Sequence, residues 1–219
     1  MPERNPVPAA PASTAAAPPT PPRPPEIILD HAGVAVGPDH VAAGDTPFAD
    51  KVVAALAGKP GVEGQGVDVV AMRNAKPSQV VAVADAVHGA KASGVVVKTS
   101  SRDDTTQKLP LTFASSLPDC TVVAWIDKEG GIDVWPAGGG TAKRVKRGLA
   151  GPDMTLGIDQ VRTQWANCES PAIVTGADDV MTWGLVFDLA QLALTAPGTR
   201  ASAVALVTNA SPGKKIALP

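Results

Sequence analysis

The chain shows one order of strands and helices twice, and this repeat constrains its fold more than any other feature. Moving residues 67–72 forward by 105 positions places them on residues 172–177. The same shift lays Val80–Val81 on Leu185–Val186. Each copy reads as a hairpin, a helix, a buried strand, a second helix and a closing strand. We therefore predict an α+β fold of two tandem β-β-α-β-α-β modules, each a small mixed sheet with two helices on one face.

Local signals in the first copy support this reading. Phe48, Val52 and Leu56 recur at helical spacing and form one apolar stripe. They follow Thr46 and Pro47, whose residue types are favoured at the start of a helix. In the second copy, a short helix is predicted to begin at Thr141.

The first residues differ in composition from the rest of the chain. Residues 1–25 hold ten of the 22 prolines, and most of the remaining residues in this segment are Ala, Thr and Ser. No hydrophobic face can be drawn there, so we predict an extended, disordered linker. The predicted organisation is a linker at 1–25, a first module at 26–102, a connector at 103–118 and a second module at 119–212.

Charge and residue content exclude several functions. The net charge of −2 argues against nucleic-acid binding, which needs an excess of Lys and Arg. The chain has no run of eighteen apolar residues, so we predict no transmembrane helix in it. The three histidines have no ligand spacing, and no Ser or Cys nucleophile has a patterned His partner. We expect neither an enzyme nor a cofactor or metal site.

Two strand–turn–helix segments resemble the core of the ExbD/TolR family, the periplasmic domains of proton-driven biopolymer transport proteins. The segment at 69–85 reads VVAMRNAKPSQVVAVAD, and the segment at 173–186 reads IVTGADDVMTWGLV. Asp178 stands where the family often has an Asp, and Trp183 stands where it has an aromatic residue. The first copy lacks both. Family members usually carry one module behind a membrane helix that holds the proton-carrying Asp, whereas this chain has two modules and no such helix.

The resemblance implies a periplasmic binding role, with an inner-membrane anchor in a segment absent from this chain. The expected partners are a stator protein of the ExbB/TolQ type, a TonB-like peptide or peptidoglycan, and a second copy in a homodimer. Two other functions stay open: a soluble envelope adaptor without a transport role, and an unrecognised small α/β enzyme or ligand-binding domain. Asp178 and Trp183 are the site residues that the resemblance implies.

Cys120 and Cys168 each lie just before a predicted strand of the second module. The two strand starts are neighbours in the predicted sheet, and periplasmic relatives occupy an oxidising compartment. With an even cysteine count, these points favour a Cys120–Cys168 disulfide. The alternative is two separate buried thiols.

Aromatic and basic residues of the second module give two further candidate surfaces. Trp125 and Trp135 share the face of the hairpin that points away from the predicted helices. This pair would be covered by the first module, a second copy, a peptide or a glycan. The predicted short helix after Thr141 would carry four cations, forming either a solvated face or a site for an acidic partner such as peptidoglycan carboxylates: Lys143, Arg144, Lys146 and Arg147.

Overall fold

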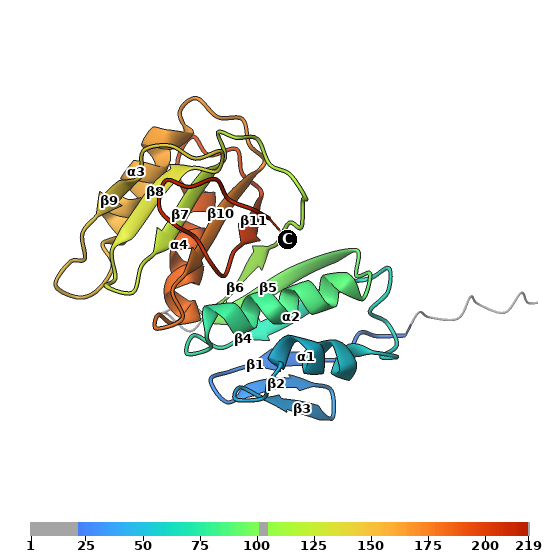
Figure 1. The fold of residues 1–219 in the computed structure, drawn as a ribbon. Helices are drawn as coiled ribbons and strands as arrows, with labels where there is room; N and C mark the ends of the chain where they lie inside the picture. Colours follow the sequence, from blue (N-terminus) through green and yellow to red (C-terminus); the bar gives the residue numbers. More distant parts are fainter. Residues whose placement is uncertain (1–21, 101–104, 219) are drawn as a thin grey trace, which may run out of the picture.

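The structure is a computed structural model that describes residues 22–100 and 105–218. Within these ranges the chain forms an α+β fold with two mixed sheets, of six and five strands, and four helices. Figure 1 shows each sheet in its own half of the molecule, the first among the blue to green elements and the second among the yellow to red ones. Most of the predicted linker, residues 1–21, lies outside the described residues.

The first half holds two helices on a six-stranded sheet. Its elements are β1 (Ile27–Leu29), β2 (Gly33–Val36), β3 (Asp39–Ala42), α1 (Phe48–Leu56), β4 (Gly66–Ala71), α2 (Pro77–Gly89), β5 (Gly94–Ser100) and β6 (Thr106–Pro110). The strand order is β3-β2-β1-β4-β5-β6. β1 pairs antiparallel with β2 and parallel with β4, and β4 pairs parallel with β5.

The second half repeats this arrangement. Its elements are β7 (Val122–Ile126), β8 (Ile132–Pro136), β9 (Lys143–Val145), α3 (Met154–Trp165), β10 (Ala172–Ala177), α4 (Trp183–Thr195) and β11 (Ala203–Leu206). The strand order is β11-β10-β7-β8-β9. β7 pairs antiparallel with β8 and parallel with β10, and β10 pairs parallel with β11, as in the first half.

Both halves contain a third strand that the sequence interpretation missed. The observed order is β-β-β-α-β-α-β, with β3 and β9 as the additional strands at the outer sheet edges. The helix predicted from Thr141 is wrong, because Lys143–Val145 pairs with β8 as strand β9. The helix α3 starts instead at Met154, where the Asp153 carboxylate accepts a hydrogen bond from the Leu156 amide (3.1 Å) and caps the first turn.

The two halves correspond most closely over the strand and helix that carry the resemblance. From Gly66 to Ala172, and from Pro77 to Trp183, the shift is 106 residues, one more than the sequence alignment used. β4 and β10 both have six residues, and α2 and α4 both have thirteen. Strand, turn and helix therefore have equal lengths in both halves.

The core lies between the helices and the sheets and is continuous from one half to the other. Alternate strand residues such as Ile27 and Leu29 meet Val52 of α1 and Val80 of α2, all at most 1% exposed. α3 contacts α4 and packs on β7 and β8 in the same way. Each sheet thus has both of its helices on one face, and the opposite face is not packed against them.

The predicted connector at 103–118 is partly a strand. Residues 106–110 form β6, which extends the first sheet beyond the predicted module end at residue 102. Directly after it, Leu111 forms a bridge with Val204 of β11, and the Thr112 amide donates to the Val204 carbonyl (2.9 Å). The segment therefore joins the edges of the two sheets, as Figure 1 shows for β6 and β11.

In the described part of the chain, the longest and most apolar helices still fall short of what is needed to cross a membrane.

Candidate functional site

The two segments that resemble the family contact each other across the two halves through their strand–helix turns. One turn joins β4 to α2, and the other joins β10 to α4. The Trp183 amide donates to the Ala75 carbonyl (2.8 Å), and the Gly184 amide donates to the Arg73 carbonyl (2.8 Å). The first turn of α4 is thus bound by the backbone of the first half, which satisfies amides that a helix start leaves unpaired.

The contact is reciprocal. Asp179 of the second turn accepts hydrogen bonds from the amide of Ser78 (3.0 Å) and from its hydroxyl (2.5 Å), at the start of α2. Arg73 and Asp179 are equivalent under the 106-residue shift, and so are Ser78 and Gly184. Each second helix therefore donates its second amide to the residue two places beyond the strand of the other half. The acceptor is the main-chain carbonyl of Arg73 in one contact and the side-chain carboxylate of Asp179 in the other, so the two contacts are related by an approximate two-fold arrangement.

An ion pair strengthens the same contact on one side. The Arg73 guanidinium donates to both carboxylate oxygens of Asp188 on α4, at 2.9 and 2.6 Å, and to the Gly184 carbonyl (3.2 Å). The Asp188 carboxylate raises the pKa of Arg73 above its ordinary value, against the opposing effect of partial burial. The two-pronged geometry fixes the orientation of α4 against the β4–α2 turn.

Asp178 and Trp183, the site residues that the resemblance implies, both lie at this junction, and their contacts there stabilise the fold. Trp183 is fully buried, and its indole N–H donates to the Thr99 hydroxyl (2.8 Å) at the end of β5. The Asp178 carboxylate accepts from the Val180 amide (3.1 Å) and so orders its own turn. Trp183 thus inserts into the first half, while Asp178 lies partly exposed at the rim of the junction.

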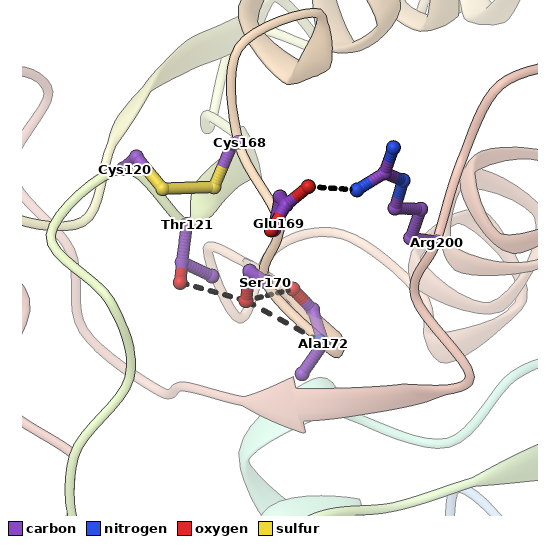
Figure 2. The surroundings of a disulfide bond; sticks show 7 residues. All are labelled: Cys120, Thr121, Cys168, Glu169, Ser170, Ala172 and Arg200. Carbon is purple, nitrogen blue, oxygen red and sulfur yellow. Dashed lines mark hydrogen bonds and ion pairs between the residues drawn. A yellow bond between two sulfur atoms is a disulfide. The ribbon is translucent and has the colours of Figure 1, made fainter.

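Cys120 and Cys168 form a disulfide in the structure, with 5.6 Å between their α-carbons. Figure 2 shows that the bridge joins the segment before β7 to the segment before β10. Beneath it, the buried Thr121 hydroxyl donates to Ser170 (2.8 Å), whose hydroxyl donates to the Ala172 carbonyl (2.9 Å). The disulfide and this chain of hydroxyl bonds hold together the starts of two neighbouring parallel strands.

Trp125 and Trp135 lie on the face of the second sheet away from its helices, as the alternation of the hairpin predicted. They are 6% and 0% exposed, in a cluster with Val123 and Val174. Residues 211–218, which we call the C-terminal strap, cover this cluster. The strap contributes Ile216 and Leu218 to the packing, and its Lys214 carbonyl accepts from the Trp135 indole (2.9 Å). Within this structure the Trp pair is covered by its own chain.

The four cations predicted to share a helix lie on and after the edge strand β9 instead. Lys143, Lys146 and Arg147 are exposed there. Arg144 forms ion pairs with Asp127 (2.5 Å) and Glu129 (2.8 Å) in the β7–β8 turn. Charges on an edge strand discourage pairing with other sheets. Lys143 and Arg144, which lie on β9, therefore protect this open sheet edge against pairing with another chain.

Asp133, near Arg144, is a buried carboxylate whose charge is only weakly neutralised by its surroundings. It is 3% exposed, and its Oδ2 has no hydrogen-bond partner. The Arg144 guanidinium lies 4.0 Å away. Burial raises the pKa of the Asp133 carboxyl, Arg144 opposes this shift, and the nearby Asp127 adds to it.

A large groove was not anticipated from the sequence. It has a volume of about 940 Å³ and runs along one face of α2, with α1 on one side and two segments of the second half on the other. The floor is made of small side chains three or four residues apart, including Ala82 and Ala86. The walls include Val53, which is 54% exposed, and Leu218 of the C-terminal strap. Its size lies within the roughly 300–1,000 Å³ range of ligand-binding pockets.

Asp85 is the acidic residue in the lining of this groove. In the described part of the chain it has no hydrogen bond or ion pair, and His88, one turn along α2, is the charged group that acts on it. Burial raises the pKa of the Asp85 carboxyl above its ordinary value, and His88 acts in the opposite direction. His88 itself stacks on Phe113, with ring centroids 4.2 Å apart. The sequence signal was an acidic residue among the Ala and Val residues of α2.

Comparisons with protein-family models, with curated proteins and with solved structures give no match for this chain. Among the described residues, no cluster of His, Cys, Asp or Glu side chains is placed to hold a metal ion. The site must therefore be interpreted from its own geometry: a reciprocal junction, a covered Trp face and an apolar groove with one acidic residue.

Proposed function

We propose that the chain is a tandem ExbD/TolR-like module of a cell-envelope complex, which acts by binding and carries out no covalent chemistry. The observation that carries the proposal is the reciprocal junction. The two segments that resemble the family occupy equivalent places and meet face to face, through Arg73, Asp179 and their partners Gly184 and Ser78. In this proposal the two halves arose by duplication and form within one chain the pair that a homodimer would form.

The disulfide supports an envelope location. Disulfides form and persist in oxidising compartments such as the periplasm, whereas cytosolic thiols are kept reduced. Cys120 lies exposed at one end of the bridge, and Cys168 is buried at the other. Their pairing agrees with a periplasmic location. In this proposal the chain engages a stator of the ExbB/TolQ type and a TonB-like peptide or peptidoglycan there.

Thiol trapping and co-isolation test the proposal together. Cells expressing an epitope-tagged chain are quenched with a thiol-alkylating reagent, and a Cys168→Ser variant provides the unpaired control. We expect the wild-type pair to be oxidised and the chain to co-isolate with an ExbB/TolQ-type stator from the same genome, in a manner sensitive to a protonophore. An oxidised pair without stator association would favour the adaptor function instead. A reduced pair in the cytosolic fraction would overturn the envelope proposal.

A further inference from the structure

The groove along α2 has the dimensions of a helix-binding site. The thirteen residues of α2 span about 20 Å at 1.5 Å per residue, and the lining residues follow one face of the helix over most of that length. Both helices of the first half contribute, so an added helix would pack on a ridge-and-groove surface of the ordinary kind. Helix-in-groove binding uses an apolar strip of this form.

The lining favours close approach of another backbone. Ala49 of α1 and Ala57, the residue after its end, line the groove together with Ala82, Ala86 and Gly89 of α2. Side chains this small let a helix axis lie near the floor, where its apolar residues contact both helices. The larger apolar groups lie at the sides, so an incoming helix would gain apolar burial there.

Charge decides what kind of helix fits. Asp85 places a carboxylate in the apolar floor, and the residues lining the groove include no Lys or Arg to neutralise it. The neighbouring His88 is stacked on Phe113 outside the lining. A cationic side chain on an otherwise apolar helix face would supply the missing countercharge, whereas an acidic one would be repelled.

We propose that the groove binds an amphipathic helix of a partner protein whose apolar face carries one Lys or Arg, which pairs with Asp85. The inference rests on the proposed binding function and adds the chemistry of the partner. The helix would lie along α2 between α1 and the strap, with its cation over the middle of α2.

Designed helical peptides test this on the purified full chain. The probe is a fluorescein-labelled Ala/Leu-rich helix of about five turns with one Lys in its apolar face. The comparison peptide carries norleucine in place of that Lys. By fluorescence anisotropy, wild type should bind the Lys peptide more tightly by about fivefold, the value of a partly shielded ion pair. In Asp85→Asn this preference should vanish.

Matched variants distinguish the groove from other surfaces. Ala49→Trp fills the groove from an exposed position and should block both peptides, whereas Ala54→Trp, exposed on α1 outside the lining, should not. Asp50→Asn removes an exposed charge outside the lining and should keep the Lys preference. Equal affinity for the two peptides, binding that Ala49→Trp leaves intact, or no binding up to about 1 mM would each overturn the inference.

The failure of this inference is separable from failure of the proposed function. If the chain is oxidised and bound to its stator in cells while the purified chain ignores the Lys peptide, the envelope function stands and the groove assignment is wrong. If the peptide binds with the expected preference but the chain is cytosolic and reduced, the groove assignment stands on its own.

Discussion

The two halves of the chain share a strand order, but the faces of their sheets opposite the helices differ. In the first half that face carries Ile28, Val70 and the Asp68–Lys98 ion pair (2.5 Å), all at least partly exposed. In the second half it carries two tryptophans beneath the C-terminal strap. The helix-facing sides are alike, with Val and Ile residues that are nearly all inaccessible to solvent.

This difference indicates which part of the sequence specifies the fold. The apolar pattern on the helix-facing side fixes register and topology, because a slip of one residue would expose it. The other face is free to diverge: in the second half it is covered by the strap, and in the first half it is open. The groove belongs to the open half, while the strap of the closed half forms one of its walls. The two halves therefore contribute different parts of the groove lining.

Removing Trp183 should affect both halves at once. Trp183→Ala leaves a large cavity where α4 enters the first half and also removes the indole donor to Thr99. The free energy of unfolding should fall by about 3–5 kcal/mol. Hydrogen exchange measured by mass spectrometry should show lost protection in β4 and β5 as well as in β10.

Trp183→Phe is the control, because it keeps most of the apolar volume and loses mainly the hydrogen bond. It should cost about 1–2 kcal/mol. If Trp183→Ala lowered protection in the second half alone, the junction would not couple the two halves.

Removing the disulfide should distinguish the halves. The Cys120→Ala/Cys168→Ala double variant opens a loop with a sequence separation of 48, and the typical cost is about 2–4 kcal/mol. Exchange protection should fall in β7 and β10 and stay unchanged in β1 and β4. An equal loss of exchange protection in both halves would show that they unfold as one cooperative unit. The two halves would then differ in structure but not in stability.

Much of the fold followed from the sequence because its signals are local. The stripe of Phe48, Val52 and Leu56 predicted a helix, which is present as α1. The third strands were missed because they have three or four residues and polar side chains, as in Lys143–Val145. Alternation of apolar and polar residues is recognised over four to eight residues. These edge strands are shorter or barely as long, and each has one buried residue, so the pattern could not be seen.

The junction and the groove were less accessible because they depend on residues distant in sequence. Arg73 and Asp188 are 115 positions apart, and no periodicity connects them. A signal existed for each: Arg73 lies two residues after the strand β4, and Asp188 interrupts an apolar helix. The strap over Trp135 had no signal, because a few apolar residues near the end of the described chain do not indicate which face they cover.

The strap should contribute less than the disulfide. Ile216→Ala removes a partly buried anchor over the Trp cluster and should cost about 1–2 kcal/mol, with Trp emission shifted to the red. Ile28→Ala on the open face of the first sheet is the matched control and should cost less. Equal losses would mean that the strap adds no more to the second sheet than solvent-facing packing adds to the first.

The smallest effect concerns Asp133, whose counterpart the first half lacks. Its pKa is raised in the folded chain, so the folded state holds this proton at a higher pH than the unfolded state does. The carboxylate therefore destabilises the fold at neutral pH, and the penalty disappears as pH falls through the raised pKa. Asp133→Asn should raise the free energy of unfolding by about 0.5–1 kcal/mol at pH 7 and by less near pH 4.

Urea denaturation at both pH values measures this effect, with Asp159→Asn on the exposed surface of α3 as the control. A destabilising Asp133→Asn at pH 7 would show that the Arg144 ion pair outweighs the burial of the charge. In that case the β7–β9 edge would be held by its charges, and the second half would owe its closure to electrostatics as well as to the strap and the disulfide.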